Sequence, residues 1–253
     1  MKNLWKITRR VQDQRQSSGV TTGDFIDRLN ELNKKAESGE FPSLTSDQIT
    51  GQGIIFLAAG FETSASSLST LCFNLAKNPE VLDRLLEEVD EVVERCDGVV
   101  DHETISDMAW LEACIKENLR LCGPVARIDR LCKKDWTSPD GRMTIKAGTY
   151  VRFPFYVIHH NPEFWPEPEL FQPERFLKEN SHNIVPYSWI PFGAGPRACI
   201  GERFAMVEMK IAMVKLLQNF TPTLTDTSKI EVLKGDLFLY NYPDFDLKFL
   251  KRK

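Results

Sequence analysis

Apolar positions in the first half of the chain recur at helical spacing. Such a stripe predicts a short helix within residues 22–36. Thr45 and Gln48 have the spacing of a capping box, so a long helix is expected from there to about Lys77. Its longest apolar run, 54–60, is far shorter than the ~20 residues that span a bilayer. We therefore interpret it as a core helix.

A second helix is expected to restart at Asn78 and Pro79, with Asn78 as N-cap and Pro79 at the first helical position. One face of it is apolar: Val81, Leu82, Leu85, Leu86, Val89, Val92 and Val93. A further helix is predicted over 108–121. These segments predict a helical core.

The pattern changes in the second half. Residues 149–155 are β-branched and aromatic, and turn signals at 140–141 and 147–148 indicate short strands around them. The proline-rich segment 161–176 excludes regular structure. A last helix is expected over 199–219, followed by two or three short strands. The fold class is therefore mainly α with a minor β part.

Composition narrows the class of protein. The chain has 253 residues, enough for one large domain or at most two, and a net charge of −4, which does not suggest nucleic-acid binding. Its six cysteines show no Cys-x-x-Cys spacing, which favours reduced thiols in a cytosol-facing protein. The first residues contain no apolar run, so no signal peptide or membrane anchor is expected there.

The candidate chemistry centres on the glycine-rich segment 192–201. It carries one cysteine, Cys199, to an expected helix start, where backbone N–H groups favour a thiolate. Phe192 can pack on a flat ring, and Arg197 can pair with a carboxylate. The segment thus suits a flat anionic cofactor. The alternative is a buried structural cysteine.

Polar residues also interrupt the long apolar helix at Glu62 and Thr63. Burying them costs free energy unless they are paired. A threonine hydroxyl can bond to a carbonyl one turn earlier and open the helix locally. Residues 59–64 therefore suit a small-molecule site, or simply a helix surface that becomes polar after Phe61.

Charged pairs downstream are less specific. Glu117 and Arg120 share a helix face, and by themselves favour an exposed pair worth ~0.2–0.5 kcal/mol. Arg127 is interpreted as solvated surface. We interpret the adjacent histidines His159 and His160 as structural, because neighbouring side chains point in different directions.

The segment 192–201 resembles the haem-binding loop of the cytochrome P-450 family, Phe-x-x-Gly-x-Arg-x-Cys-x-Gly, at every specified position, including Gly201. The resemblance implies that Cys199 ligates the haem iron and promotes O–O cleavage. Residues 59–64 resemble the family's oxygen-binding motif. There Thr63 would hold the oxygen species, Glu62 would relay protons and Ala59 would face haem and substrate.

Three further features are implied by the resemblance. Arg130 matches a position that pairs with a haem propionate. Glu117, Arg120 and Arg175 would form a buried ion network that supports the haem loop. A basic face could dock a redox partner, and its candidate residues are Lys133, Lys134, Arg203 and Lys210.

The resemblance runs from about Thr22 to the end, covers only the family's C-terminal half and is closest to the animal microsomal branch. It implies a single partial domain over residues 1–253 of the P-450 fold, and a fragment. The implied function is a monooxygenase that contains haem b and inserts oxygen from O2 into a small apolar substrate such as a steroid, lipid or xenobiotic.

Electrons would come from NADPH through a flavoprotein reductase, with cytochrome b5 as a further partner. The location would be the cytosolic face of the endoplasmic reticulum membrane, reached only through the N-terminal half. Two alternatives stay open: a truncated haem-binding or non-catalytic protein, and an enzyme that rearranges oxygenated lipids. Glu62 and Thr63 argue against the second, which has less need of proton delivery.

Overall fold

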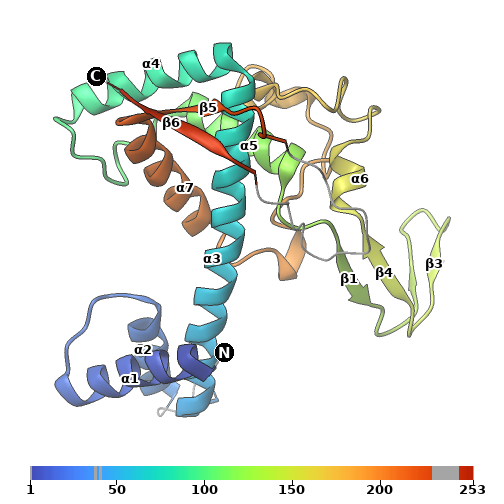
Figure 1. Cartoon of the computed structure of the whole chain (residues 1–253). Coiled ribbons are helices and arrows are strands. Elements are labelled where there is room, and N and C mark those ends of the chain that lie inside the picture. Colours follow the sequence, from blue (N-terminus) through green and yellow to red (C-terminus); the bar gives the residue numbers. More distant parts are fainter. Residues whose placement is uncertain (1, 37–38, 40–41, 230–244, 253) are drawn as a thin grey trace. The chain divides into compact units, whose positions relative to one another are not determined.

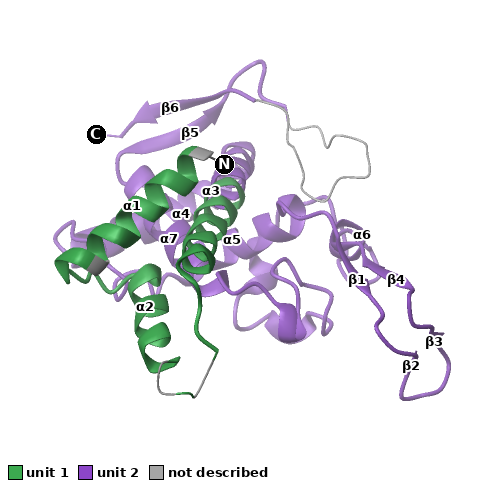
Figure 2. Cartoon of the chain, turned by 90° about the horizontal axis from the view of Figure 1, so that it is seen from below, with its two compact units in different colours: residues 1–63 green, residues 64–253 purple. Residues whose placement is uncertain are grey.

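The computed structural model describes residues 2–36, 39, 42–229 and 245–252 (Figure 1). The chain divides into two compact units, residues 1–63 and 64–253 (Figure 2). The boundary falls within one long helix, α3 (Ser46–Lys77). Helices dominate the described residues, and the strands are short. This confirms the prediction of a mainly α protein with a minor β part.

The first unit contains α1 (Lys2–Ser18), α2 (Phe25–Ala36) and the start of α3. The sequence did not predict α1, because its buried positions are polar. Gln12 is fully buried and bonds to two α3 side chains, Ser46 Oγ at 3.1 Å and Thr50 Oγ1 at 2.7 Å. These hydrogen bonds attach α1 to α3.

The predicted capping box begins α3. The Thr45 backbone N–H donates to Gln48 Oε1 at 2.8 Å, and the Gln48 N–H donates to Thr45 Oγ1 at 3.2 Å. Further along, Gly53 permits α1 to approach, since a Cβ there would lie 2.7 Å from a Thr8 methyl carbon. By length and composition, α3 is the one helix among the described residues that is able to cross a membrane. A core helix passes the same test.

The second unit is built around an apolar core. The end of α3 packs there with α4 (Pro79–Arg95), α5 (Ala109–Cys122) and α7 (Glu202–Leu217). The predicted stripe of α4 faces this core. Asn78 is the N-cap residue of α4 and Pro79 begins the helix, both as predicted. The Asn78 side chain makes no capping hydrogen bond and donates instead to the Asn74 carbonyl, one turn back in α3, at 2.7 Å.

The strands of the second unit form three two-stranded antiparallel sheets in the described residues. The pairs are β1 (Ile128–Leu131) with β4 (Tyr150–Phe153), β2 (Trp136–Thr137) with β3 (Thr144–Ile145), and β5 (Phe220–Leu224) with β6 (Leu247–Lys251). The predicted turns at 140–141 and 147–148 contain Gly141 and Gly148 at positive φ, which glycine adopts without strain. A third strand in the tail would fall at 230–244, outside the described residues.

The proline-rich segment has no α-helix or strand, as predicted. It ends in a 3-10 turn, η1 (Pro173–Phe176), and η2 (Ser181–Asn183) and η3 (Gly195–Arg197) follow. A short helix, α6 (Phe155–His159), precedes it. The last predicted helix begins at Glu202 and not at Cys199, because the glycine-rich loop continues through Gly201. No disulfide joins the six cysteines, all of which lie in the described residues.

Candidate functional site

Cys199 lies at the surface of the second unit, between η3 and α7. The loop before it closes on itself, because the Cys199 backbone N–H donates to the Phe192 carbonyl at 2.8 Å. Gly193 and Gly195 have a φ of 75°, which disfavours a side chain at either position. The following Ile200 is 94% exposed. The loop therefore presents a thiol and an apolar side chain to the outside.

The other residues predicted for this site differ in exposure. Phe192 is half-buried and packs partly against the apolar core. Arg197 is exposed on η3, and no ion pair involves it in the described part of the chain. Arg130 is exposed on β1 and donates to the Asp129 carbonyl at 3.0 Å. A Cβ at Gly201 would make only ordinary contact with Cys199 Sγ, at 3.9 Å.

These residues fit a haem. Cysteines are usually buried, yet this one is exposed on a loop with apolar and cationic neighbours. By contrast, burial raises the pKa of Cys72 to about 12 and raises that of Cys114 well above its usual value. Those two thiols are therefore poor ligands. Of these three cysteines, Cys199 is the one that an external group can reach.

The residues that resemble the family's oxygen-binding motif lie on α3, and those from Ala59 to Thr63 are in the first unit. The Thr63 hydroxyl donates to the Ala59 carbonyl at 2.6 Å, which is the back-bond expected from the sequence. The helix nevertheless continues through this turn. Ala59 and Glu62 are exposed, and the position where a Cβ of Gly60 would lie is open space. This surface is open to a small molecule.

Ser64, the next residue, belongs to the second unit and is buried. Its hydroxyl donates to Glu208 Oε2 on α7 at 2.7 Å. No sequence pattern indicates this bond, because the two residues are 144 positions apart in the chain. Within the second unit, this bond joins the last part of α3 to α7.

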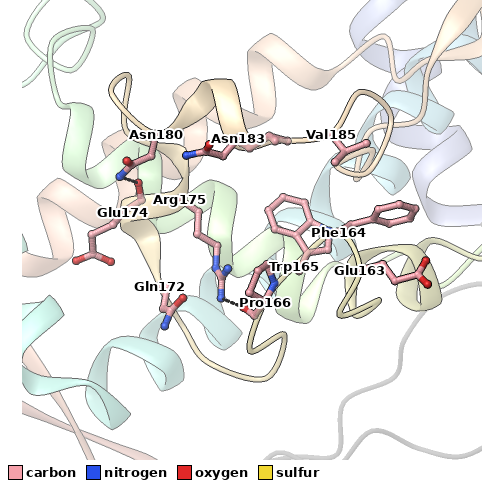
Figure 3. A pocket seen from close by; sticks show the side chains of 11 residues that line it. Glu163, Phe164, Trp165, Pro166, Gln172, Glu174, Arg175, Asn180, Asn183 and Val185 are labelled. Carbon is pink, nitrogen blue, oxygen red and sulfur yellow. Dashed lines mark hydrogen bonds between the residues drawn. The ribbon is translucent and has the colours of Figure 1, made fainter.

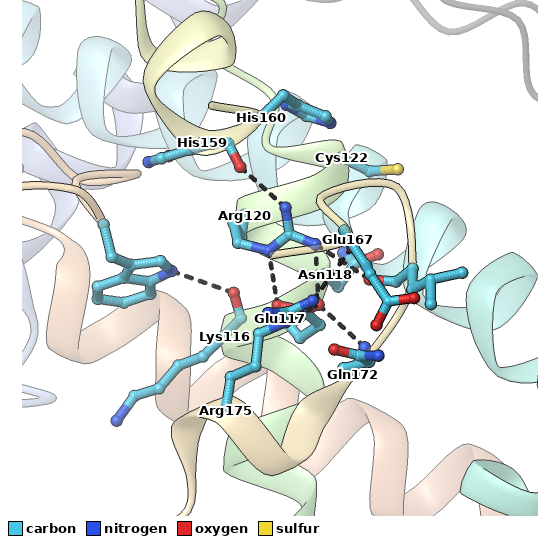
Figure 4. A network of polar contacts seen from close by, with 12 residues as sticks. Lys116, Glu117, Asn118, Arg120, Cys122, His159, His160, Glu167, Gln172 and Arg175 are labelled. Atoms are coloured by element: carbon cyan, nitrogen blue, oxygen red, sulfur yellow. Dashed lines mark hydrogen bonds and ion pairs between the residues drawn. The ribbon is translucent and has the colours of Figure 1, made fainter. Parts of the chain in front are cut away.

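The Glu117–Arg120 pair is fully buried and not exposed (Figure 4). Two hydrogen bonds join it, from Arg120 Nε to Glu117 Oε2 at 2.8 Å and from Nη2 to Oε1 at 2.9 Å. Arg175 Nε lies 3.5 Å from Glu117 Oε1, and the Gln172 N–H donates to the same oxygen at 2.9 Å. The ion network implied by the resemblance is present. The exposed-pair interpretation is wrong, because distant loops cover the pair.

Desolvation raises the pKa of Glu117, while hydrogen bonds from Arg120 and Gln172 oppose that effect. Burial also disfavours the charged form of Arg175 and therefore lowers its pKa. Arg120 also donates to the carbonyls of His159 at 2.8 Å and Leu170 at 3.1 Å. The network thus connects α5 to α6 and to the proline-rich segment.

Sequence reasoning did not find the contacts between this network and the cysteine loop. His159 is buried, and its Nε2 accepts a hydrogen bond from the Ile190 N–H at 3.0 Å. Trp189 Nε1 donates to the Lys116 carbonyl at 3.2 Å. Both contacts hold the segment 189–190, which leads into the cysteine loop. No sequence pattern indicates these two contacts. The structural sign of the first is that His159, a polar residue, is buried.

One predicted docking residue does not fit that role. Lys210 is buried, with its Nζ 2.7 Å from Glu112 Oε2 and 3.3 Å from the Ile105 carbonyl oxygen. The prediction of a surface charge at Lys210 is therefore wrong, because its charge is neutralised inside the unit. Lys133, Lys134 and Arg203 are exposed.

A separate pocket of about 710 Å³ borders η1 and η2 (Figure 3). At this pocket, Arg175 Nη2 donates a hydrogen bond to the Pro166 carbonyl at 2.6 Å. The pocket is lined by Glu163, Phe164, Trp165, Pro166, Gln172, Glu174, Arg175, Asn180, Asn183, Ile184 and Val185. No residue predicted to hold haem is among them.

The family model for cytochrome P450 matches residues 2–249. The chain belongs to the cytochrome P450 family. This match begins at residue 2, whereas the motifs in the sequence indicate a resemblance only from about Thr22. It confirms the predicted family and the partial P450 fold.

Several curated animal cytochromes P450 are similar to the chain. Cytochrome P450 9e2 of Blattella germanica is 37% identical over 238 residues, covering 89% of this chain and 45% of that protein. Cytochrome P450 3A16 of Mus musculus is 42% identical, covering 85% and 42%. Cytochrome P450 3A7 of Homo sapiens is 41% identical, covering 87% and 44%. The chain spans less than half the length of these relatives, and they confirm the predicted likeness to animal members.

Proposed function

We propose that the protein to which this P450 chain contributes is a haem-thiolate monooxygenase with Cys199 as the iron ligand. It would insert one oxygen atom from O2 into a small apolar molecule such as a steroid, lipid or xenobiotic. The observation that carries the proposal is the exposed Cys199 thiol, on a loop that satisfies every specified position of the haem-binding pattern. Membership of the P450 family supports it.

Haem b, when bound, supplies oxygen activation, and a thiolate ligand favours O–O cleavage. The loop residues bind and orient it. Arg197 and Arg130 are exposed cations, each suited to a charge-assisted hydrogen bond to a haem carboxylate. The exposed part of Phe192 and the small Gly201 leave room for a flat ring beside the sulfur.

Residues of α3 would handle protons and substrate. The Thr63 hydroxyl donates its own proton to the Ala59 carbonyl at 2.6 Å, and the oxygen of a hydroxyl group has lone pairs that accept hydrogen bonds. Glu62 is exposed and can exchange protons with water. We assign proton delivery to Thr63 and Glu62, and contact with haem and substrate to Ala59.

Electrons would come from NADPH through a flavoprotein reductase, with cytochrome b5 as a second donor. Exposed basic residues at Lys133, Lys134 and Arg203 suit an acidic protein surface. The proposed location is the cytosolic face of the endoplasmic reticulum membrane.

The test is the reduced, carbon-monoxide-bound difference spectrum of the chain expressed with haem. A strongly red-shifted Soret band is expected for the unchanged chain and is lost in Cys199→Ser. The matched control is Cys132→Ser, a change to a half-buried cysteine outside the loop, which should keep the band. A thiolate band that survives in Cys199→Ser would overturn the ligand assignment.

A haem-binding protein without catalysis is the alternative. A thiolate band without NADPH-dependent oxygenation, in the presence of reductase, would favour it. The same assay with Thr63→Ala separates the two proposals. Monooxygenation that depends on Thr63 must become uncoupled, while haem binding through Cys199 stays unchanged.

A further inference from the structure

His159 connects the buried ion network to the cysteine loop. It is the last residue of α6 and is 3% exposed. Its carbonyl accepts from Arg120 Nη1 at 2.8 Å, and its ring Nε2 accepts from the Ile190 N–H at 3.0 Å. One residue thus joins a charged group of α5 to the backbone that enters the loop. Figure 4 shows the carbonyl of His159 directed at Arg120 and its ring directed away.

The contact lies close to the loop in sequence. Ile190 precedes Phe192 by two residues, and the Phe192 carbonyl accepts the N–H of Cys199 at 2.8 Å. Arg120 thus donates to the His159 carbonyl, the Ile190 N–H donates to the His159 ring, and two residues further along the backbone the Phe192 carbonyl accepts from Cys199. A shift of Ile190 would be transmitted through two residues to the carbonyl that holds Cys199.

The ring is held in the form that can accept this hydrogen bond. Burial, with smaller effects from the positive charges of Arg120 and His160, lowers the pKa of His159 to about 3. The imidazole is therefore neutral at neutral pH, and the hydrogen bond from the Ile190 N–H selects the tautomer with the lone pair on Nε2. Phe155 stacks on the ring, with centroids 6.2 Å apart, and helps to fix its plane.

We propose that His159 is a positioning residue that holds the entry of the haem loop and so fixes Cys199 for the iron. This assignment rests on the proposed function for its iron-binding part. The hydrogen bond to Ile190 and its effect on the loop do not depend on haem. They can be tested in the chain without it.

The chain offers a matched control in the next residue. His160 is half-buried and stacks on Tyr156, with centroids 3.9 Å apart. Its Nδ1 lies 2.9 Å from the Tyr156 carbonyl oxygen, within the same turn of chain. His160→Phe therefore changes an adjacent imidazole without touching the bond to Ile190.

The first experiment measures amide hydrogen exchange in peptides that contain Ile190 and Cys199, without haem. His159→Phe should exchange roughly three- to tenfold faster at both, the factor expected for one hydrogen bond. His159→Gln, which keeps an acceptor, should restore most of the protection, and His160→Phe should resemble the unchanged chain. Equal exchange in His159→Phe and His160→Phe would overturn the proposal, as would equal loss in His159→Phe and His159→Gln.

The second experiment adds haem and records the reduced carbon-monoxide spectrum. His159→Phe should lower the fraction of thiolate-bound haem several-fold, and His159→Gln should recover it. If the unchanged chain gives no thiolate band, the proposed function fails, while the exchange data still decide the role of His159 in the loop. An undiminished thiolate fraction in His159→Phe would overturn the role in positioning Cys199.

Discussion

The middle of α3 and its C-terminal end differ in the burial of their apolar side chains. In the first unit Ile55, Leu57 and Phe61 are exposed, Phe61 to 76%. In the second unit Leu71 and Leu75 are completely buried in the apolar core. Apolar residues at helical spacing therefore predict the helix but not which of its turns enter a core.

The two units also differ in the polarity of the side chains that they bury. The first unit buries polar side chains, among them Thr8, Gln12, Asp27 and Thr50. The second buries a continuous apolar cluster, with its charges confined to paired groups such as Glu117 and Arg120. A buried aliphatic side chain contributes about 1.5–3 kcal/mol, and a typical hydrogen bond about 0.5–1.5 kcal/mol. We expect the second unit to be the more stable.

The largest effect is expected from breaking the buried pair. Arg120→Ala removes both hydrogen bonds that Arg120 donates to the buried Glu117 carboxylate and leaves only Arg175 and the Gln172 N–H beside it, which should lower the free energy of unfolding of the second unit by about 3–5 kcal/mol. Glu117→Gln, which keeps the shape of the side chain but removes its charge, should also lower the free energy of unfolding, by a smaller amount. Chemical denaturation followed by hydrogen exchange, read separately for residues 1–63 and 64–253, measures it.

The first unit provides the control for this pair. Arg28 and Glu31 have the same spacing and an N···O distance of 3.0 Å, but both side chains are more than half exposed. Arg28→Ala should therefore cost at most about 0.5 kcal/mol. Equal losses for Arg28→Ala and Arg120→Ala would show that burial does not decide the strength of these pairs.

The next effect compares the middle of α3 with its C-terminal end directly. Leu75→Ala creates a cavity in the core and should cost about 2–5 kcal/mol. Phe61→Ala removes an exposed side chain and should change the unfolding free energy by no more than about 0.5 kcal/mol, while raising solubility. Urea denaturation and the solubility limit test both changes. A large loss in Phe61→Ala would mean that this part of α3 is packed in solution.

The acid side of the stability profile should depend on His159. The pKa of His159 is about 3 in the folded chain and near 6.5 in the unfolded chain. Between these two pH values the imidazole is therefore protonated in the unfolded chain and neutral in the folded chain. This contribution is complete above pH 6.5 and is lost as the pH falls toward 3. From pH 7 to 5 the loss should be about 2 kcal/mol.

The measurement is the free energy of unfolding against pH for the unchanged chain and for His159→Gln. The variant should show a shallower decline over pH 7 to 5, because glutamine does not titrate there. His160 is still present in both proteins and its contribution cancels. Parallel curves would contradict the buried, neutral state of His159.

What the sequence could predict follows from these contrasts. The stripe of α4, the capping box at Thr45 and the glycine turns depend on neighbouring residues, and all three were predicted. Helix α1 was not, because Thr8 and Gln12 on its buried face are polar and give no hydrophobic period. Short-range patterns report local structure but not a polar interior.

The candidate site divides along the same line. The loop of Cys199 could be recognised because its residues are contiguous. The burial of Glu117 was implied only by the family resemblance, and that of Lys210 was not predicted, since their partners Gln172 and Ile105 lie 55 and 105 residues away. The role of His159 likewise depends on a bond to Ile190, 31 residues further on. Contacts of this kind are set by packing and not by spacing.

The smallest effect concerns the capping box, and it tests whether the two units respond separately. Thr45→Ala removes the hydroxyl that accepts the Gln48 N–H at 3.2 Å, which should cost about 0.5–1 kcal/mol because the box is exposed. Thr45→Ser keeps the hydroxyl and should be nearly neutral. Faster exchange is expected in the first turns of α3, with residues 64–253 unchanged. Because α3 continues into the second unit, acceleration at Leu71 or Leu75 would instead mean that the helix unfolds as one cooperative element.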